Sequence, residues 1–537
     1  MRGKPEILAF LCNWCSYAGA DLAGTSRLSY PSNVRSIRVM CSGRVEPSFI
    51  LNAFMNGMDG VLVSGCHPGD CHYISGNLKA EKNVKATKKI LKLLGLGAER
   101  LRLEWISASE GQKFANVITD FTTKLKRMGP NPLKQKSRQQ ETPVKKVPIL
   151  QVIEDTNIRL CLECGKCSSS CPITRMNPDF SPRMTVKRIL SGAEDISVND
   201  PGIWACLTCG LCQERCPSDV HYVDFVRACR EEAQQMGITG TCSHKDVLLD
   251  LQRIMTNPKT KQKRLGWLPK DAKISESGDI LYFVGCLPYF DVILKDIKAN
   301  SIKTAKSVVR IMNKVGIEPV ILKNERCCGH DLNFTGDREN FEKLARMNVE
   351  AIRQTKAKKV VTSCAECYRT MKLDYPKVAG DLGFEVEHVS EFLDDIIKKE
   401  QLEFTEVFKD KKLTYQDPCR LGRHMGVYDA PRSVIKSIPE TDLLEMERNR
   451  ENSACCGVSA WLSCGKIAKQ IQIDRLMEAK ATGAEWLITA CPKCQIHLKC
   501  AMSGELPVKR SKVDVKVYDL PVLVERALDK KHARKKR

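Results

Sequence analysis

Short apolar runs alternate with segments of helical apolar spacing over the first 126 residues. The runs that predict strands are 7–11, 37–40, 61–64 and 101–106, and the segments that predict helices are 18–30, 47–56, 79–94 and 112–125. Strands that alternate with helices are typical of a parallel sheet covered by helices. We therefore expect residues 1–126 to form a small α/β domain.

The same alternation returns in the C-terminal half, after a region without predicted strands. Strands are predicted at 280–284, 359–362, 412–415 and 486–489, joined by helices such as 303–315 and 468–479. The earlier segments 182–191 and 223–236 predict helices. The segment 127–150 contains Gly, Pro and many polar residues, which is typical of a linker.

These patterns predict a multidomain α/β chain. The first domain is flavodoxin-like in outline, the second part is mostly helical, and the last is a duplicated α/β unit. The expected parts are a domain at 1–126, a linker at 127–150, a helical module at 151–275, two related domains at 276–400 and 401–526, and a basic tail at 527–537.

The chain has a formal net charge of +22, and the excess is spread along it. Its clearest runs are Lys134, Lys136, Arg138, Lys145 and Lys146 in the linker, and Lys530 to Arg537 in the tail. We interpret them as a solvated surface and a basic tail, the alternative being a surface that attracts anionic substrates or acidic partners. We expect no nucleic-acid partner.

No run approaches about 18 uninterrupted apolar residues, so no membrane span is predicted. The N-terminus leads straight into a strand instead of a signal segment, which favours a cytoplasmic protein.

The chain contains 27 cysteines, and many of them cluster in CxxC spacings, which favours metal ligation over disulfides here. Two runs read C-x2-C-x2-C-x3-C-P, the spacing with which bacterial ferredoxins hold two cubane clusters. Three close thiolates wrap one cluster and the fourth reaches the other. One [4Fe–4S] cluster is therefore expected on Cys161, Cys164, Cys167 and Cys216, and a second on Cys206, Cys209, Cys212 and Cys171.

Five other cysteines lie at or after the ends of predicted strands: Cys12, Cys15, Cys41, Cys66 and Cys71. Because open parallel sheets bind ligands at the carboxyl ends of their strands, we expect these thiols to converge on one rim. Four of the five would hold a [2Fe–2S] cluster, and the spacing leaves open which one is spare. A structural zinc site is the alternative.

The C-terminal half carries one five-cysteine pattern twice, in the order C…CCG…CxxC. The first copy consists of Cys286, Cys327, Cys328, Cys364 and Cys367, and the second of Cys419, Cys455, Cys456, Cys491 and Cys494. Five thiolates exceed the need of a cubane, and adjacent cysteines before a glycine would let one sulfur bridge metals. The repeat predicts duplicated metal chemistry. Cys229, Cys242, Cys464 and Cys500 belong to no motif.

Particular segments add resemblances to known families. CNWCSYAGAD, MCSGRV and GCHPGDCHYISGN closely resemble the delta subunit of the methyl-viologen-reducing hydrogenase. This resemblance implies one [2Fe–2S] cluster that passes electrons from a hydrogenase or another dehydrogenase to a flavoprotein. The C-terminal repeat, with DPCRLGRHMGVYDAPR, resembles the CCG domains in the B subunit of heterodisulfide reductase. The module before it resembles the C subunit of that enzyme, and the fusion of the two resembles its D subunit.

In that family each complete five-cysteine motif holds a non-cubane [4Fe–4S] cluster, and the two clusters flank a substrate disulfide. Iron–sulfur subunits of glycolate and lactate oxidases lose a cysteine from one copy, whereas this chain loses none. The resemblance implies reduction of the coenzyme M–coenzyme B heterodisulfide in a methanogen, or of another disulfide elsewhere. It also implies two partners. One is the FAD-containing A subunit, which would allow electron bifurcation, and the other is an upstream hydrogenase, formate dehydrogenase or other dehydrogenase.

The chemistry itself favours two sites. Reducing a disulfide takes two electrons, and two iron sites avoid a free thiyl radical because each binds one nascent thiolate. His330 and His424 are the nearest candidate proton donors, and Arg420 and Arg423 are candidates for anchoring an anionic substrate. Arg420 stands where family members often carry histidine. No Gly-rich dinucleotide fingerprint follows a strand, so no flavin is expected in this chain.

Two other functions remain open at this point. One is an electron-transfer protein of a flavin dehydrogenase complex that passes electrons to a quinone or a protein disulfide. The other is a zinc-rich interaction protein.

Overall fold

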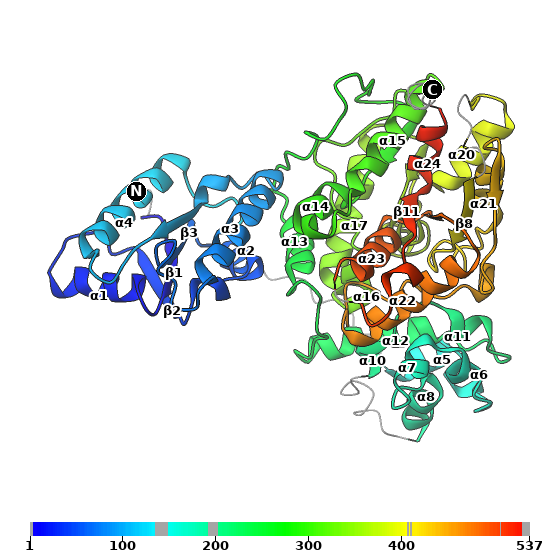
Figure 1. The fold of residues 1–537 in the computed structure, drawn as a ribbon, viewed down its shortest axis with the longest axis horizontal. Helices are drawn as coiled ribbons and strands as arrows, with labels where there is room; N and C mark the ends of the chain where they lie inside the picture. The colour runs from blue at the N-terminus through cyan, green and yellow to red at the C-terminus, as the bar shows by residue number, and fades with distance from the viewer. Residues whose placement is uncertain are drawn as a thin grey trace. The chain divides into compact units, whose positions relative to one another are not determined.

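The chain forms two compact units in the computed structural model (Figure 1). The structure describes residues 4–134, 149–191, 202–404, 408, 411–504 and 506–528. Unit 1 joins Met1–Pro143 with His244–Gly266, and unit 2 joins Val144–Ser243 with Trp267–Arg537. No helix within the described ranges is long and apolar enough to cross a membrane. Most of the basic linker run and the basic tail lie outside the described residues.

Unit 1 is built on a four-stranded parallel sheet in the order β2-β1-β3-β4. The strands are β1 (Ile7–Cys12), β2 (Val34–Val39), β3 (Gly60–Gly65) and β4 (Leu101–Trp105), and the helices are α1 (Ser16–Thr25), α2 (Pro47–Met55), α3 (Gly76–Leu93) and α4 (Gly111–Met128). The central strands β1 and β3 are apolar and buried, as expected for strands covered on both faces. The predicted alternation of strands and helices is confirmed.

One predicted boundary in unit 1 is wrong. The helix expected over 18–30 ends at Thr25 because the chain turns out of the helix there. Arg27 takes a left-handed φ of 55°, and the Leu28 N–H donates back to the Ala23 carbonyl at 2.9 Å. Such a closing bond terminates a helix regardless of the apolar residues that follow it.

A segment from later in the chain completes unit 1. Helix α13 (Val247–Met255) packs against α2, and the Asn52 side chain donates a 3.1 Å hydrogen bond to the Asp250 carboxylate. The Lys263 N–H donates to the Leu93 carbonyl at 2.8 Å. Residues 244–266 lie within the range expected for the helical module, yet they pack with the first domain.

Unit 2 begins with a series of short helices. Its described residues before 244 form none of the strands β1 to β11. The helices are α5 (Ile149–Asp155), α6 (Lys166–Ser170), α7 (Pro172–Met176), α8 (Pro182–Leu190), α10 (Gly202–Ala205), α11 (Leu211–Glu214) and α12 (Tyr222–Gln235). The predicted helices at 182–191 and 223–236 are confirmed as α8 and α12.

Two parallel sheets follow, one for each copy of the repeat. The first has the order β5-β6-β7, from β5 (Ile280–Phe283), β6 (Lys359–Thr362) and β7 (Glu385–His388). The second has the order β11-β10-β8-β9, from β8 (Lys411–Gln416), β9 (Thr441–Leu443), β10 (Trp486–Thr489) and β11 (Lys516–Asp519). In both sheets the strand before the CxxC motif is internal, which places that motif at the centre of the sheet edge.

Helices connect these strands and cover the sheets. In the first copy they are α14 (Leu287–Ile293), α15 (Ser301–Lys314), α16 (His330–Thr335), α17 (Arg338–Gln354), α18 (Ala365–Arg369), α19 (Tyr375–Ala379) and α20 (Val389–Lys398). In the second they are α21 (Asp429–Lys436), α22 (Lys466–Ala481), α23 (Pro492–Met502) and α24 (Leu520–Ala527). Mixed α/β architecture with several parallel sheets is therefore confirmed.

A first prediction concerns the packing of residues 244–266 against the first domain. Gly95 has φ +72°, and a Cβ at this position would lie 1.8 Å from the Lys261 carbonyl oxygen. Gly57 has φ +86°, but its added Cβ would meet only the Lys134 Cγ, at 3.6 Å. Alanine at either position costs about 1–2 kcal/mol for the left-handed backbone. Only Gly95→Ala should also displace the 244–266 segment.

Amide hydrogen exchange checks this expectation. Faster exchange across 247–255 is expected in Gly95→Ala and not in Gly57→Ala. Equal exchange in the two variants would contradict the packing of this segment against the α3–β4 turn.

Candidate functional site

Five thiols converge on one rim of unit 1, at the carboxyl ends of β1 and β3. The sulfur atoms of Cys12, Cys15 and Cys66 all lie within 4.8 Å of one another. Cys41 and Cys71 lie together beside Gly76, where an added Cβ would be 2.1 Å and 3.3 Å from their respective sulfurs. The thiol arrangement suits a soft metal, and the residues present fit a thiolate-ligated cluster.

Hydrogen bonding inside this group favours a thiolate. The Cys15 thiol is the main cause that lowers the pKa of Cys12 to about 5. Two neighbouring histidines are engaged with other side chains: His67 Nε2 lies 2.7 Å from the Glu110 carboxylate, and the His72 ring stacks on Trp14 at 3.8 Å. These contacts suit the orienting role expected beside metal ligands.

Eight thiols of unit 2 line two neighbouring cavities. The first is bordered by Cys161, Cys164, Cys167 and Cys216. The second is bordered by Cys171, Cys206, Cys209 and Cys212. Cys212 also borders the first cavity. The fourth thiol of each run therefore faces the cavity of the other run, as the spacing predicts.

The two cavities differ in access. Cys164 is exposed, and Leu160 and Leu162 beside it are 57% and 71% exposed. Cys206 and Cys209 are buried. The first cavity therefore has one exposed thiol, Cys164, whereas the four thiols of the second are buried or half-buried.

The ten thiols of the repeat form one continuous series of contacts. In the first copy Cys286 contacts Cys327, Cys328 lies 3.3 Å from Cys367, and Cys367 contacts Cys364. The second copy repeats this order with Cys419, Cys455, Cys456, Cys494 and Cys491. The two copies meet where Cys364 contacts Cys491.

The series continues into the helical module. Cys209 contacts Cys455, which is the main cause that lowers the pKa of Cys209 to about 5. Arg423 donates a 2.8 Å hydrogen bond to the Cys209 carbonyl and a 2.7 Å bond to the Ser453 carbonyl. The guanidinium thus joins the backbone beside the second cavity to the backbone beside the second CCG motif.

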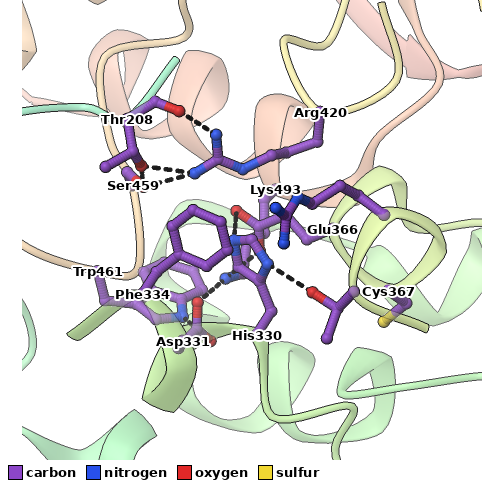
Figure 2. A network of polar contacts seen from close by, with 12 residues as sticks. Thr208, His330, Asp331, Phe334, Glu366, Cys367, Arg420, Ser459, Trp461 and Lys493 are labelled. Carbon is purple, nitrogen blue, oxygen red and sulfur yellow. Dashed lines mark hydrogen bonds and ion pairs between the residues drawn. The ribbon is translucent and has the colours of Figure 1, made fainter. Parts of the chain in front are cut away.

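Arg420 makes a parallel connection. It donates to the Thr208 carbonyl, to the Thr208 hydroxyl at 2.6 Å and to the Ser459 hydroxyl at 3.1 Å (Figure 2). Thr208 has φ 46°, an uncommon backbone conformation for a β-branched residue. Arg420 and Arg423, expected to anchor substrate, are both directed at backbone of the helical module. Their substrate role stays a prediction.

The two candidate proton donors are buried among cations. Burial, followed by the charge of Arg420, lowers the pKa of both His330 and His424 well below the usual range. His330 contacts the Thr370 hydroxyl at 2.9 Å, and His424 accepts from Arg420 at 2.8 Å. These lowered pKa values disfavour both imidazoles as proton donors.

A buried charge network lies beside His330 (Figure 2). Lys493 forms ion pairs with both Asp331 and Glu366, and the Trp461 Nε1–H donates to Asp331 at 3.1 Å. The His330, Asp331 and Glu366 side chains lie close enough to hold a metal ion, but the Lys493 ammonium already supplies a cation to both carboxylates. Burial raises the pKa of Glu366 to about 8.

Sequence reasoning missed this network, although one signal was present. Glu366 is the third residue of Cys-Ala-Glu-Cys, and Lys493 is the third residue of Cys-Pro-Lys-Cys. Opposite charges at equivalent positions of a repeat indicate that the copies face each other. Both residues also border a cavity lined by four second-copy thiols, namely Cys419, Cys456, Cys491 and Cys494.

The contact between the module and the second copy generates a second prediction. Arg420→Met should leave the buried Thr208 carbonyl without this donor and destabilise unit 2 by about 1–3 kcal/mol. The control Thr208→Val removes the hydroxyl but keeps the carbonyl bond, and should cost about 1 kcal/mol. Urea unfolding monitored by tryptophan fluorescence measures both. An Arg420→Met midpoint equal to that of wild type would contradict this assignment.

Family models match most of the chain. Residues 7–129 match the delta subunit of methyl-viologen-reducing hydrogenase, 157–220 match a 4Fe-4S dicluster domain, and 280–372 and 413–499 each match a cysteine-rich domain. These matches cover the three kinds of cysteine motif described above.

Related proteins repeat this division. The D subunit of dihydromethanophenazine:CoB–CoM heterodisulfide reductase from Methanosarcina mazei is 34% identical over 419 residues, which are 72% of this chain and 98% of the relative. The iron-sulfur D subunit of the vhc F420-non-reducing hydrogenase from Methanococcus voltae is 55% identical over 132 residues, 25% of this chain and 92% of the relative. The A subunit of ferredoxin:CoB-CoM heterodisulfide reductase from Methanosarcina mazei is 55% identical over 126 residues, 24% of this chain and 16% of the relative.

The hydrogenase relative matches a quarter of this chain, whereas the first relative matches 72% of it. By its motifs and this full-length match, the chain belongs to the family of the heterodisulfide reductase D subunit, with a domain of the hydrogenase delta type at its N-terminus.

Proposed function

We propose that this chain is the electron-transfer and catalytic iron–sulfur subunit of a heterodisulfide reductase-like complex. Electrons enter from a hydrogenase, formate dehydrogenase or other dehydrogenase and from an FAD-containing partner similar to the A subunit of heterodisulfide reductase. They pass through one [2Fe–2S] and two cubane [4Fe–4S] clusters to two non-cubane [4Fe–4S] clusters, where a disulfide is cleaved. Coenzyme M–coenzyme B heterodisulfide is the substrate we propose for a methanogen source.

The observation that carries this proposal is the unbroken series of thiol contacts in unit 2. It runs from the second cavity of the module, through the Cys209–Cys455 contact, into the second copy. It continues across the Cys364–Cys491 contact into the first copy. Electron transfer is faster between closely spaced centres, and adjacent thiols from the module and both copies would bring their clusters close together.

The fold supports the finer assignments. The parallel order β2-β1-β3-β4 in unit 1 is the order expected of a flavodoxin-like domain. The two module cavities, each faced by three thiols of one run and one of the other, support a two-cubane ferredoxin module. The two sheets support CCG domains at 276–400 and 401–526.

The residues of this chain hold the proposed clusters and control their surroundings. The thiolates of the two five-cysteine motifs would hold the non-cubane clusters, which supply single electrons and iron soft enough to bind thiolate sulfur. Arg420 and Arg423 fix the backbone next to Cys209 and so fix the distance to Cys455. Leu160 and Leu162 offer an apolar surface beside Cys164 for an electron donor. Eight of the repeat's ten thiols are buried, all except Cys286 and Cys419, and burial keeps bulk water from them.

Disulfide turnover by the complete chain tests the function. The protein reconstituted with iron and sulfide and given reduced viologen should release two thiols per heterodisulfide, as two electrons and two protons require. Cys367→Ser should abolish thiol release while one-electron dye reduction by the module is retained. Intact clusters without thiol release by the wild-type chain would overturn the proposal and favour an electron-transfer protein serving a quinone or a protein disulfide.

A separate prediction concerns the fourth cysteine of each run, which we propose to bind the cluster of the other run. If Cys171 serves the cluster of Cys206, then Cys171→Ser with Cys206→Ser removes ligands of a single cluster, about four iron atoms. Cys171→Ser with Cys164→Ser removes ligands of both clusters, about eight iron atoms. Iron analysis and EPR spectroscopy of the reduced double variants distinguish the two cases. The reverse pattern would show that each run holds its own cluster.

A further inference from the structure

Glu366 and Lys493 occupy equivalent places in the two copies of the repeat. Each is the third residue of its CxxC motif, in a helix that begins directly after the internal strand of its sheet. The two side chains are 9% and 6% exposed and form an ion pair across the copies. The duplicated sites share one set of ligand types but carry opposite charges at this one position.

Lys493 connects three ligand-bearing segments at once. From the second copy's CxxC helix it pairs with Glu366, in the first copy's CxxC helix, and with Asp331. Asp331 lies in α16, which starts directly after Cys327-Cys328-Gly329. Its other carboxylate oxygen accepts from Trp461 Nε1, and the Lys493 ammonium lies 4.9 Å from the Trp461 ring (Figure 2).

The ion pair lies next to the point where the two thiol sites meet. Cys364 contacts Cys491, and each is the first residue of the CxxC motif that carries one member of the pair. Lys493 acts electrostatically on Cys364 of the other copy, and Glu366 acts on Cys491. Both charges therefore lie at this junction between the copies.

A buried ion pair is weak evidence for stability, because desolvation of the two charges offsets much of their attraction. Such a pair can instead determine which two surfaces pack together, because packing the wrong two surfaces would bury like charges against each other. Two first copies brought together would oppose Glu366 to Glu366, and two second copies would oppose Lys493 to Lys493. Only the first copy against the second gives an ion pair.

We propose that Lys493, Glu366 and Asp331 are positioning residues that fix the register between the two thiol sites. They hold the Cys364–Cys491 contact, so that both sites reach one disulfide. This inference rests on the proposed function for its catalytic consequence but not for its structural one. The residues act through the ligands and need not touch the substrate.

Charge exchange tests the register. Lys493→Met and Glu366→Lys each break the pair. The triple variant Glu366→Lys/Lys493→Glu/Asp331→Asn restores it in the reverse sense, because the third substitution removes the Asp331 charge that a glutamate at 493 would face. Lys499→Met is the matched control, since Lys499 lies on the same helix α23 but donates to the Ala299 carbonyl at 3.2 Å. Three measurements are made on the full reconstituted chain: iron content, thiol release, and hydrogen exchange of α18 and α23.

Each single variant should lose at least about tenfold in thiol release, since small misplacements of reacting groups have effects of this size or larger. Iron content and one-electron dye reduction should stay within about twofold of wild type, as for the control. Hydrogen exchange should rise in both α18 and α23 of each single variant, and the triple variant should recover protection and most of the thiol release. A triple variant no better than the single ones would overturn the register.

The outcomes separate this inference from the proposed function. If the wild-type chain releases no thiol, the proposed function fails. The hydrogen exchange of α18 and α23 then decides by itself whether the register is correct. If thiol release falls in proportion to iron content, the residues serve cluster assembly and the register is overturned. Lys493→Arg covers the case in which Lys493→Met fails to fold, because it keeps the charge and should retain protection of both helices.

Discussion

Contact between sulfur atoms carried by different segments is the constraint on which unit 2 depends. Cys209 belongs to the helical module, Cys455 to the second copy and Cys364 to the first, and their contacts require all three to be held in register. Parallel sheets satisfy part of this constraint, because they bring loops from distant parts of the chain to one edge. Buried guanidinium and ammonium groups satisfy the rest, by binding the backbone and carboxylates that flank the thiols.

The placement of the thiols could be predicted from the sequence to a large extent. A strand followed at once by cysteine fixes where that thiol lies once the sheet is parallel, and this argument held for Cys12, Cys66 and Cys364. The packing of residues 244–266 on unit 1 could not be predicted in this way. The apolar spacing of a short amphipathic helix shows that one face is buried, but not which surface buries it. The early end of α1 depended on one left-handed residue, Arg27, which no apolar periodicity reveals.

The polar residues show a different limit. Proximity in sequence to a cysteine singled out His330, His424, Arg420 and Arg423, but the partners that decide what these groups do come from elsewhere in the chain. Arg420 binds Thr208, 212 positions away. A comparison of the two copies could have identified Lys493 and Glu366, because these residues stand at equivalent positions and carry opposite charges.

Differences between the copies extend beyond that pair. The residue three positions after the last cysteine is Thr370 in the first copy and His497 in the second. His497 Nδ1 lies 3.4 Å from the Cys456 sulfur, whereas Thr370 contacts His330. Hydrogen bonds to ligand sulfur are one means by which proteins adjust the potential of a cluster. The duplicated ligand set therefore has unequal surroundings, and the copy whose sulfur contacts histidine is also the copy that contacts the helical module through Cys209. The two sites are therefore alike in their thiols and unlike in the polar groups around them.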